Sequence, residues 1–557
     1  MSPAKAVLLF LLLLTGLRLA YVGRVELSPD EAYYQMWSER LDWGYYSKGP
    51  GVAATIRAGT SLFGVNEFGV RFFSPMLALG TSLVLFALAR RLYGDGPAAW
   101  TVVLLNVTPL FTAGSLLMTI DPLSVFFWSV AMATCWRALE EETSPGARFA
   151  WWLLTGAAVG LGFLAKYTNA AELLGIIMAL WLVPRWRGQF RRPGFYAMLL
   201  VALAVGSPPF FWNASHAWIT LNHLHDRGRL GSAFDRPLGE FGEFVGAHFG
   251  VYSPLVFAGL LVGLWWGWQR GRLRWTFWRR SARRNTAGTL LDAGAVRARF
   301  LLAFGLPLLT IYTVLSFKTA GEPNWTAPAF LSLSILAVAL WHERARTSRL
   351  ARSFCVAALA VGLLCSVAVL NTDNFRRLGI PWAYDRDPTA RLLGWRSTAQ
   401  SVETFRAEEE RQLGAPVFLI ANRYQLAAEL NFYLRDHPAP ALSPDHPAVY
   451  LPESQAIENQ FSLWPGYDQV QAPPPRPPGA PAPTTAEEEF RGLGASPFVG
   501  RSALFITDDE RRRRLPSSIE SGFEECNLVA RFEVRRQGQP LRRLRVYACF
   551  NYKGLDL

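Results

Sequence analysis

The chain has 557 residues, 51% of them hydrophobic, and a formal net charge of +13 at pH 7. Much of the basic charge lies in short loops between apolar segments, which is typical of membrane proteins and argues against nucleic-acid binding. An ordinary soluble enzyme is excluded as well, because apolar runs of about 18 residues or more recur as far as residue 371.

The first apolar run covers residues 6–22 and follows Lys5. The many apolar segments that follow, and the lack of a clear small-residue cleavage site, favour an uncleaved helix over a signal peptide. Residues 51–63 are weakly amphipathic and are expected to lie along the membrane interface. Counting the first run, the sequence predicts about 11 transmembrane helices. The others are expected at 70–89, 97–114, 120–137, 150–166, 170–184, 196–212, 250–269, 300–317, 327–341 and 353–371.

Basic residues alternate along this predicted topology. With the N-terminus in the cytoplasm, the cytoplasmic loops should be the ones rich in arginine. The strongly basic short loops all fall on that side; they contain Arg90 and Arg91, Arg137 and Arg148, Arg185 to Arg192, Arg270 to Arg299, and Arg344 to Arg352. The other side receives the loop after the first span, the turn before Asp121, Lys166, residues 213–250, residues 318–325 and the C-terminal region. We therefore expect a functional site on the extracytoplasmic side, which in a bacterium is the periplasmic face of the inner membrane.

The sequence predicts a transmembrane domain over 1–371 and a soluble extracytoplasmic α/β domain over 372–557. The second domain should contain strands at 416–421 and 502–508, a helix at 424–434 and a terminal hairpin. Residues 472–483, APPPRPPGAPAP, are expected to be a proline-rich loop.

The five cysteines show no metal-ligand spacing. Cys526 and Cys549 lie in the predicted soluble domain. They could form a disulfide if that domain is outside the cytoplasm, and the sequence leaves this open.

The loop at 28–50, SPDEAYYQMWSERLDWGYYSKGP, combines acids, aromatic residues and a lysine. Asp30 and Glu31 are candidate catalytic carboxylates. The alternative is that an acid here caps the helix that follows, although a cap explains only one of the two.

Asp121 is the third candidate catalytic acid. It opens the apolar run MTIDPLSVFFW, where a charge at the membrane boundary is costly and points to function. The alternative is a helix cap beside Pro122.

Lys48 lies between glycines and aromatic residues in YYSKGPG and suits a phosphate, with Tyr45 and Tyr46 available to contact a sugar. Snorkelling to the interface is the alternative for Lys48 and for Lys166. The segment NHLHDRGR offers Arg227 and Arg229 for phosphate binding. His223 and His225 in the same segment are weak evidence for a metal, so a divalent cofactor stays open. The remaining candidate binding residues are Lys166, His248, Lys318, Glu322 and Asn324.

These residue types suit transfer of a sugar from a lipid phosphate. The donor needs cations for its leaving phosphate, and an acceptor hydroxyl needs a carboxylate base. The sequence contains neither a G-x-G-x-x-G nor a Walker motif that would hold a nucleotide sugar.

The first-loop sequence, the later TIDPLSVFFW and the late EPNWTAP element together resemble glycosyltransferase family 39, and YQLAAELNFYL resembles the soluble tail of its bacterial members. The resemblance implies a GT-C fold, inverting transfer and a polyprenyl-phosphate donor. It also implies that Asp30 acts on the acceptor hydroxyl, that Asp121 is a second essential aspartate, and that Lys48 contacts donor phosphate. Ser47 replaces the acid of the family's Tyr-Phe-Glu-Lys-Pro-type motif, which puts a metal site using that acid in doubt.

The sequence thus predicts a polyprenyl-phosphate-dependent glycosyltransferase acting on lipid A, another glycolipid or an envelope glycan. A protein O-glycosyltransferase and a transporter of lipid-linked sugars are the alternatives. The transporter is disfavoured because the charges lie at the ends of the spans rather than in their middles. The sugar and the acceptor are not determined by the sequence.

Overall fold

The computed structural model describes residues 2–229, 236–271, 293–380, 382–435, 446–468, 496, 498–508 and 514–554. They form two compact units. The first comprises Met1–Arg24 and Leu41–Asn374, and the second comprises Val25–Arg40 and Phe375–Leu557. The division after Asn374 is close to the predicted one after residue 371. The predicted proline-rich loop at 472–483 and most of the basic loop at 270–299 lie outside the described residues.

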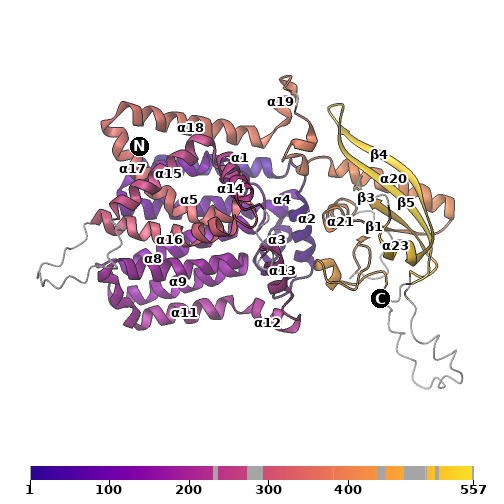
Figure 1. The fold of residues 1–557 in the computed structure, drawn as a ribbon, viewed down its shortest axis with the longest axis horizontal. Helices are drawn as coiled ribbons and strands as arrows, with labels where there is room; N and C mark the ends of the chain where they lie inside the picture. Colours follow the sequence, from indigo (N-terminus) through magenta and orange to yellow (C-terminus); the bar gives the residue numbers. More distant parts are fainter. Residues whose placement is uncertain are drawn as a thin grey trace, which may run out of the picture. The chain divides into compact units, whose positions relative to one another are not determined.

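The first unit is helical, and Figure 1 shows α8, α9 and α11 lying side by side within it. Its α-helices are α1 (Pro3–Val22), α3 (Gly51–Phe63), α4 (Glu67–Arg71), α5 (Phe73–Tyr93), α6 (Asp95–Asn106), α7 (Pro109–Gly114), α8 (Ile120–Leu139), α9 (Pro145–Ala165), α10 (Ala171–Leu182), α11 (Pro193–Gly206), α12 (Pro208–Ser215), α13 (Ile219–Arg227), α14 (Pro237–Tyr252), α15 (Pro254–Arg270), α16 (Ala293–Leu315), α17 (Ala327–Thr347) and α18 (Arg349–Leu370). The 3₁₀ turns η1 (Tyr167–Ala170), η2 (Pro184–Arg191) and η4 (Pro323–Thr326) connect some of them.

Within the described ranges, six helices are long and apolar enough to cross a membrane, or up to eight if each of two bent pairs is one span. The multi-pass membrane fold is therefore confirmed, while the predicted count of about 11 is not. Two predicted spans are replaced by shorter helices in the structure. Residues 97–114 form α6 and α7, which are separated near Val107, and residues 170–184 hold the 12-residue α10.

Helix α17 is central to this unit, and each of its residues from Ala327 to Leu340 is buried. Small residues let its neighbours approach closely, as is common between membrane helices. A Cβ added to Gly263 of α15 would lie 2.4 Å from the Ala337 Cβ, and one added to Gly305 of α16 would lie 2.7 Å from the Leu333 side chain.

Candidate site residues and arginines lie at opposite ends of these helices. Asp121 is in the first turn of α8, and Arg137 is in its last turn. Helix α9 ends at Ala165 with Lys166 as its C-cap, and η4 leads directly into α17, whose last turn holds Arg344 and Arg346. Ion pairs crosslink the arginine-rich end, for example Arg91 with Glu140 at 3.1 Å and Arg270 with Glu343 at 3.0 Å. This arrangement agrees with the sidedness expected from the loops.

The second unit has a five-stranded sheet in the order β2-β1-β3-β5-β4. Strands β2 (Val449–Tyr450), β1 (Val417–Ala421) and β3 (Ser502–Thr507) are parallel, while β5 (Gln539–Tyr552) runs antiparallel to both β3 and β4 (Phe523–Arg536). The helices are α2 (Pro29–Glu39), α20 (Trp395–Leu413), α21 (Tyr424–Tyr433) and α23 (Ser517–Gly522), with 3₁₀ turns η5 (Tyr384–Arg386), η6 (Ala390–Leu392) and η7 (Gln460–Leu463). Helix α19 (Asp373–Arg377) crosses the boundary between the units. The predicted C-terminal α/β domain is thus confirmed.

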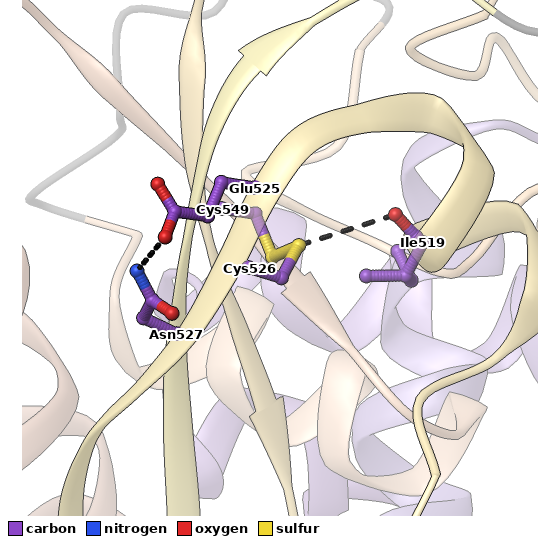
Figure 2. The surroundings of a disulfide bond; sticks show 5 residues. All are labelled: Ile519, Glu525, Cys526, Asn527 and Cys549. Atoms are coloured by element: carbon purple, nitrogen blue, oxygen red, sulfur yellow. Dashed lines mark hydrogen bonds between the residues drawn. A yellow bond between two sulfur atoms is a disulfide. The ribbon is translucent and has the colours of Figure 1, made fainter.

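Cys526 and Cys549 form a disulfide (Figure 2). They are register partners on the antiparallel strands β4 and β5, so their Cα atoms are 4.1 Å apart. This resolves the question that the sequence left open, and it ties the terminal hairpin together.

Helix α2 belongs to the second unit although it follows the first apolar helix in the chain. Ser28 and Glu31 form a capping box at its start, with Pro29 in the first turn. Seven consecutive residues, Ala32 to Ser38, are buried. The ring of Tyr33 lies 4.7 Å from that of Tyr424 at the start of α21. The sequence predicted that residues 28–50 belong to the membrane domain. In the structure, residues up to Arg40 belong to the second unit.

Candidate active site

The carboxylate of Asp121 is the centre of a polar cluster in the first unit. Its Oδ1 accepts a hydrogen bond from Lys166 Nζ at 2.7 Å, and its Oδ2 accepts one from Asn324 Nδ2 at 2.7 Å. The Lys166 side chain is 8% exposed and that of Asp121 is 18% exposed. The helix-cap alternative fails for Asp121, because Thr119 is the N-cap of α8 and accepts the Asp121 N–H.

Lys166 reaches Asp121 because the turn after α9 is fixed to α8. Asn169 in η1 accepts the hydroxyl of Ser124 at 2.5 Å and donates to the Ser124 carbonyl at 3.0 Å. Asn169 also donates to Glu172 at 2.9 Å, and all three residues are buried. Lys166 is therefore a held ion-pair partner, and the snorkelling alternative does not describe it.

Asn324 reaches Asp121 from η4, and His248 supports that turn. His248 is 1% exposed, and its Nδ1 donates to the Phe244 carbonyl at 2.7 Å. Its Nε2 lies 2.7 Å from the hydroxyl of Thr326, two residues after Asn324. Both ring nitrogens have protein partners, so the prediction that His248 binds substrate is not supported. Its geometry is that of a buried residue that holds η4.

A second group of side chains contains the predicted phosphate ligands Lys48 and Arg227. The ring of His223 lies 4.9 Å from that of Tyr46. Burial, followed by the positive charges of Lys48 and Arg227, lowers the pKa of His223 to about 4. His223 is therefore neutral at physiological pH, and the surrounding cations give this group a positive field suited to an anion.

Aromatic residues continue this group toward η4. The guanidinium of Arg227 lies over the ring of Trp325, 5.5 Å from its centroid. Trp325 lies 5.4 Å from the ring of Tyr312 on α16. Because Trp325 adjoins Asn324 in the chain, the cationic group and the Asp121 cluster meet at the same turn. The first unit thus joins a held carboxylate to cations and aromatic faces.

Tyr45 is a predicted substrate residue that the structure places in the interior. It is fully buried, and its hydroxyl accepts the Asp42 N–H at 3.1 Å. Its carbonyl accepts the Thr220 hydroxyl at 3.3 Å. Tyr45 therefore fixes the shape of the loop and ties it to α13, and the prediction that it contacts sugar is not supported.

Asp30 and Glu31 lie in the second unit, on α2. Asp30 is 42% exposed at its side chain, and its Oδ2 lies 3.9 Å from Arg391 Nη2. Glu31 is fully buried, and its Oε2 accepts both the Ser28 N–H at 2.9 Å and the Ser28 hydroxyl at 3.0 Å. The two acids therefore differ. Glu31 has the structural role of a cap partner, which does not support the catalytic prediction, and Asp30 keeps an accessible carboxylate.

The remaining candidates lie in the loops around η4. Lys318 Nζ donates to the Arg229 carbonyl at 3.4 Å, so both residues belong to one exposed loop contact. Glu322 is exposed and is the N-cap residue of η4. The acid that holds this loop is instead Glu240, which accepts the Ala320 N–H at 2.7 Å.

Sequence reasoning missed Tyr312 and Trp325 and gave His223 only a weak metal role. Trp325 was detectable, since it lies in the quoted EPNWTAP element, but Tyr312 sits in an apolar run without any local signal. Across the described part of the chain, no group of three or more His, Cys, Asp or Glu side chains could hold a metal ion.

Residues 47–212 match a protein family described as dolichyl-phosphate-mannose-protein mannosyltransferase. Lipid A galacturonosyltransferase RgtD from Rhizobium johnstonii is 30% identical over 317 residues, covering 56% of this chain and 60% of that protein. Undecaprenyl phosphate-alpha-4-amino-4-deoxy-L-arabinose arabinosyl transferase 2 from Pseudomonas fluorescens is 29% identical over 210 residues, covering 33% of this chain and 37% of that protein. The chain thus matches less than two thirds of the length of either relative.

The crystal structure of ArnT from Cupriavidus metallidurans in the apo state matches 98% of this chain and 98% of its own, with a TM-score of 0.60 and 17% identity. The same protein bound to undecaprenyl phosphate matches with a TM-score of 0.58. At this identity the likeness shows a shared fold, which is the GT-C fold with a C-terminal sheet domain.

Proposed function

We propose that this chain is a GT-C membrane glycosyltransferase that moves a sugar from a polyprenyl-phosphate carrier to a lipid A-type glycolipid at the extracytoplasmic face of the membrane. The observation that carries the proposal is the joining of Asp121, Lys166 and Asn324 to a cationic and aromatic group at one end of the helices. A lipid-phosphate donor needs polar and cationic side chains for its head group beside apolar helices for its lipid tail.

The relatives support the donor and the acceptor class. One is a lipid A galacturonosyltransferase and another is an arabinosyl transferase whose name includes an undecaprenyl-phosphate sugar. ArnT, which has the same fold, has been crystallised with undecaprenyl phosphate. The sugar of this chain is left to experiment, because its relatives carry different ones.

The proposed extracytoplasmic side rests on two observations. The arginine-rich helix ends, which favour the cytoplasm, lie opposite the Asp121 cluster. The Cys526–Cys549 disulfide in the second unit fits an oxidising compartment such as the periplasm.

In the proposed reaction an acceptor oxygen attacks the anomeric carbon while the bond from that carbon to the phosphate oxygen breaks. The phosphate leaves with the electron pair and gains negative charge, which Lys48 and Arg227 stabilise electrostatically. Asp30 takes the proton when the acceptor is a hydroxyl. Asp121 accepts hydrogen bonds from Lys166 and Asn324. Its proposed role is to hold the Lys166 ammonium and the Asn324 amide in the orientation in which they contact the substrate.

The test compares envelope lipids from cells with and without this chain by mass spectrometry, followed by assay of the purified protein with the implied polyprenyl-phosphate sugar. A glycolipid mass that disappears with the chain, and is restored by the wild type but not by Asp121→Asn, is the expected result. Membrane insertion of the variant must be equal to that of the wild type.

Two outcomes would replace the proposal with another function. A donor that crosses the bilayer with its glycosidic bond uncut would identify a transporter. Loss of a sugar from envelope proteins, with glycolipids unchanged, would identify a protein O-glycosyltransferase.

A further inference from the structure

Tyr33 anchors helix α2 to η7 and α21. It is 5% exposed, and its hydroxyl accepts the backbone N–H of Gln460 in η7 at 2.6 Å. Its ring is stacked on Phe461 at 5.9 Å with an interplanar angle of 4°. The rings of Tyr424 and Trp37 lie 4.7 and 4.9 Å away. Two of these contacts, Gln460 and Phe461, come from more than 400 positions later in the chain.

The chain just before α2 is held by the same unit. The Leu27 N–H donates to the Tyr433 hydroxyl at 2.8 Å. The carboxylate of Glu26 accepts the backbone N–H groups of Trp395 at 2.8 Å and Arg396 at 3.3 Å, at the start of α20. These contacts hold the chain before α2, the capping box holds its first turn, and Tyr33 holds the turn that follows.

Asp30 lies just before the buried stretch of α2, which runs from Glu31 to Ser38. It lies three residues before Tyr33, so both are on neighbouring positions of one helix surface. Its carboxylate is 42% exposed, while Tyr33 and the residues after it are buried. Glu39, the other exposed acid of α2, lies at the last turn and pairs with Arg435 at 2.9 Å. An exposed carboxylate in the first turn of a well-anchored helix is the arrangement expected of a preorganised reactive group.

We infer that Tyr33 is a positioning residue for Asp30, because it sets where that carboxylate stands within the second unit. The inference rests on the proposed function, in which Asp30 acts on the acceptor. The contact that does this is the Tyr33 hydroxyl with the Gln460 N–H, because it fixes the rotation of α2 relative to η7. Tilting the helix would displace Asp30 without unfolding the unit.

The test is Tyr33→Phe, which keeps the ring and removes the acceptor of the Gln460 N–H. We expect kcat to fall about 10- to 100-fold, since a displacement near 1 Å can cost that much. The Kd for undecaprenyl phosphate should be unchanged. Hydrogen exchange in peptides covering residues 25–40 should accelerate.

Tyr467→Phe is the matched control. Tyr467 follows η7 in the chain and is also buried, and its hydroxyl also accepts a backbone N–H, that of Glu453 at 3.3 Å. Its ring faces Phe418 and Tyr552 in the sheet core rather than α2. A general loss of stability would appear in both variants, whereas lost positioning would lower kcat only in Tyr33→Phe.

The results separate this inference from the proposed function. If Asp30→Asn abolishes transfer and Tyr33→Phe retains wild-type kcat, Tyr33 does not position Asp30. Equal kcat losses in Tyr33→Phe and Tyr467→Phe would also overturn the inference. If Asp30→Asn is fully active, the proposed role of Asp30 is itself wrong.

Discussion

Gly49 lies so close to Leu164 that a Cβ on this glycine would be 2.3 Å from the Leu164 carbonyl oxygen. Gly51 likewise approaches Ala165, with 3.0 Å between its added Cβ and the Ala165 Cα. The glycines of the first loop therefore let Lys48 lie against the end of α9, where Lys166 follows. This approach joins the loop to the Asp121 cluster.

Replacing Gly49 with alanine should disrupt this approach. The clash is with backbone, which cannot rotate away, so we expect a loss of about 1–3 kcal/mol in stability and a strong loss of transfer. Thermal unfolding in detergent and a transfer assay would measure both. Gly146→Ala is the control, because nothing lies within 4 Å of its added Cβ. Normal activity in Gly49→Ala would mean that the loop position is unimportant.

The Asp121–Lys166 pair can be tested with a double-mutant cycle. Lys166→Met leaves a poorly exposed carboxylate without its cation and should cost about 3 kcal/mol of stability. Adding Asp121→Asn should restore part of this stability because the unpaired charge is gone, while transfer stays abolished. Unfolding and turnover measured on the single and double variants separate the two roles. Additive stability losses would show that the pair is not coupled.

Donor binding should be accompanied by proton uptake at His223. Its pKa is lowered to about 4 by burial and by the cations Lys48 and Arg227. A bound phosphate adds negative charge beside these cations and should raise the pKa, so His223 takes up a proton at mildly acidic pH. Calorimetry of undecaprenyl phosphate binding in buffers of different ionisation enthalpy would detect the uptake. His223→Gln should remove it, and equal uptake in this variant would exclude His223.

Glu453 should make the second unit less stable as pH rises. Burial, followed by the neighbouring Asp468 carboxylate, raises the pKa of Glu453 from 4.5 to about 8. Between these values the folded state holds a proton that the unfolded state has lost, so the free energy of unfolding falls as pH increases through this window. Glu453→Gln should flatten the dependence. Unfolding of the wild type that is independent of pH between 4.5 and 8 would contradict this prediction.

Removing the disulfide should weaken the terminal hairpin. Cys526 and Cys549 are separated by 23 positions, and closing a loop of that size contributes about 3 kcal/mol in the chain-entropy account. We expect Cys526→Ala with Cys549→Ala to lower the unfolding temperature of the second unit. Reduction of the wild type should do the same but should leave the double variant unaffected. A wild type that is insensitive to reductant would show that the bridge adds no stability.

The fold class and the Asp121, Lys166 and Asn324 cluster were accessible from sequence. Charged residues at the ends of predicted membrane spans are rare and therefore easy to detect. The positions of the basic loops predicted that these three residues lie on the same, extracytoplasmic side of the membrane. Lys48 and Arg227 were predicted as phosphate ligands, Lys48 from the glycines beside it and Arg227 from its basic segment. These signals are local in the chain, so one sequence is sufficient to detect them.

Three other predicted site residues have structural contacts that the sequence did not indicate. Tyr45, His248 and Glu31 have chemistry that suits a site, yet each is buried and satisfied by backbone or hydroxyl partners. Tyr312 joins the site through its ring contact with Trp325, which depends on how the helices pack and not on a local sequence pattern. The place of α2 in the second unit depends on residues near 424 and 460, and no pattern within 25–40 reveals it.

The discontinuity of the second unit also constrains how the protein is made. Helix α2 leaves the ribosome early, but Gln460, its partner through Tyr33, is 427 residues away. At about 5–20 residues per second, roughly 20–85 s separate their synthesis. During that interval Tyr33 lacks the rings of Tyr424 and Phe461 that later pack against it. The nascent chain must therefore carry α2 without these partners until residue 460 has been made, so the second unit can complete its core only late in synthesis.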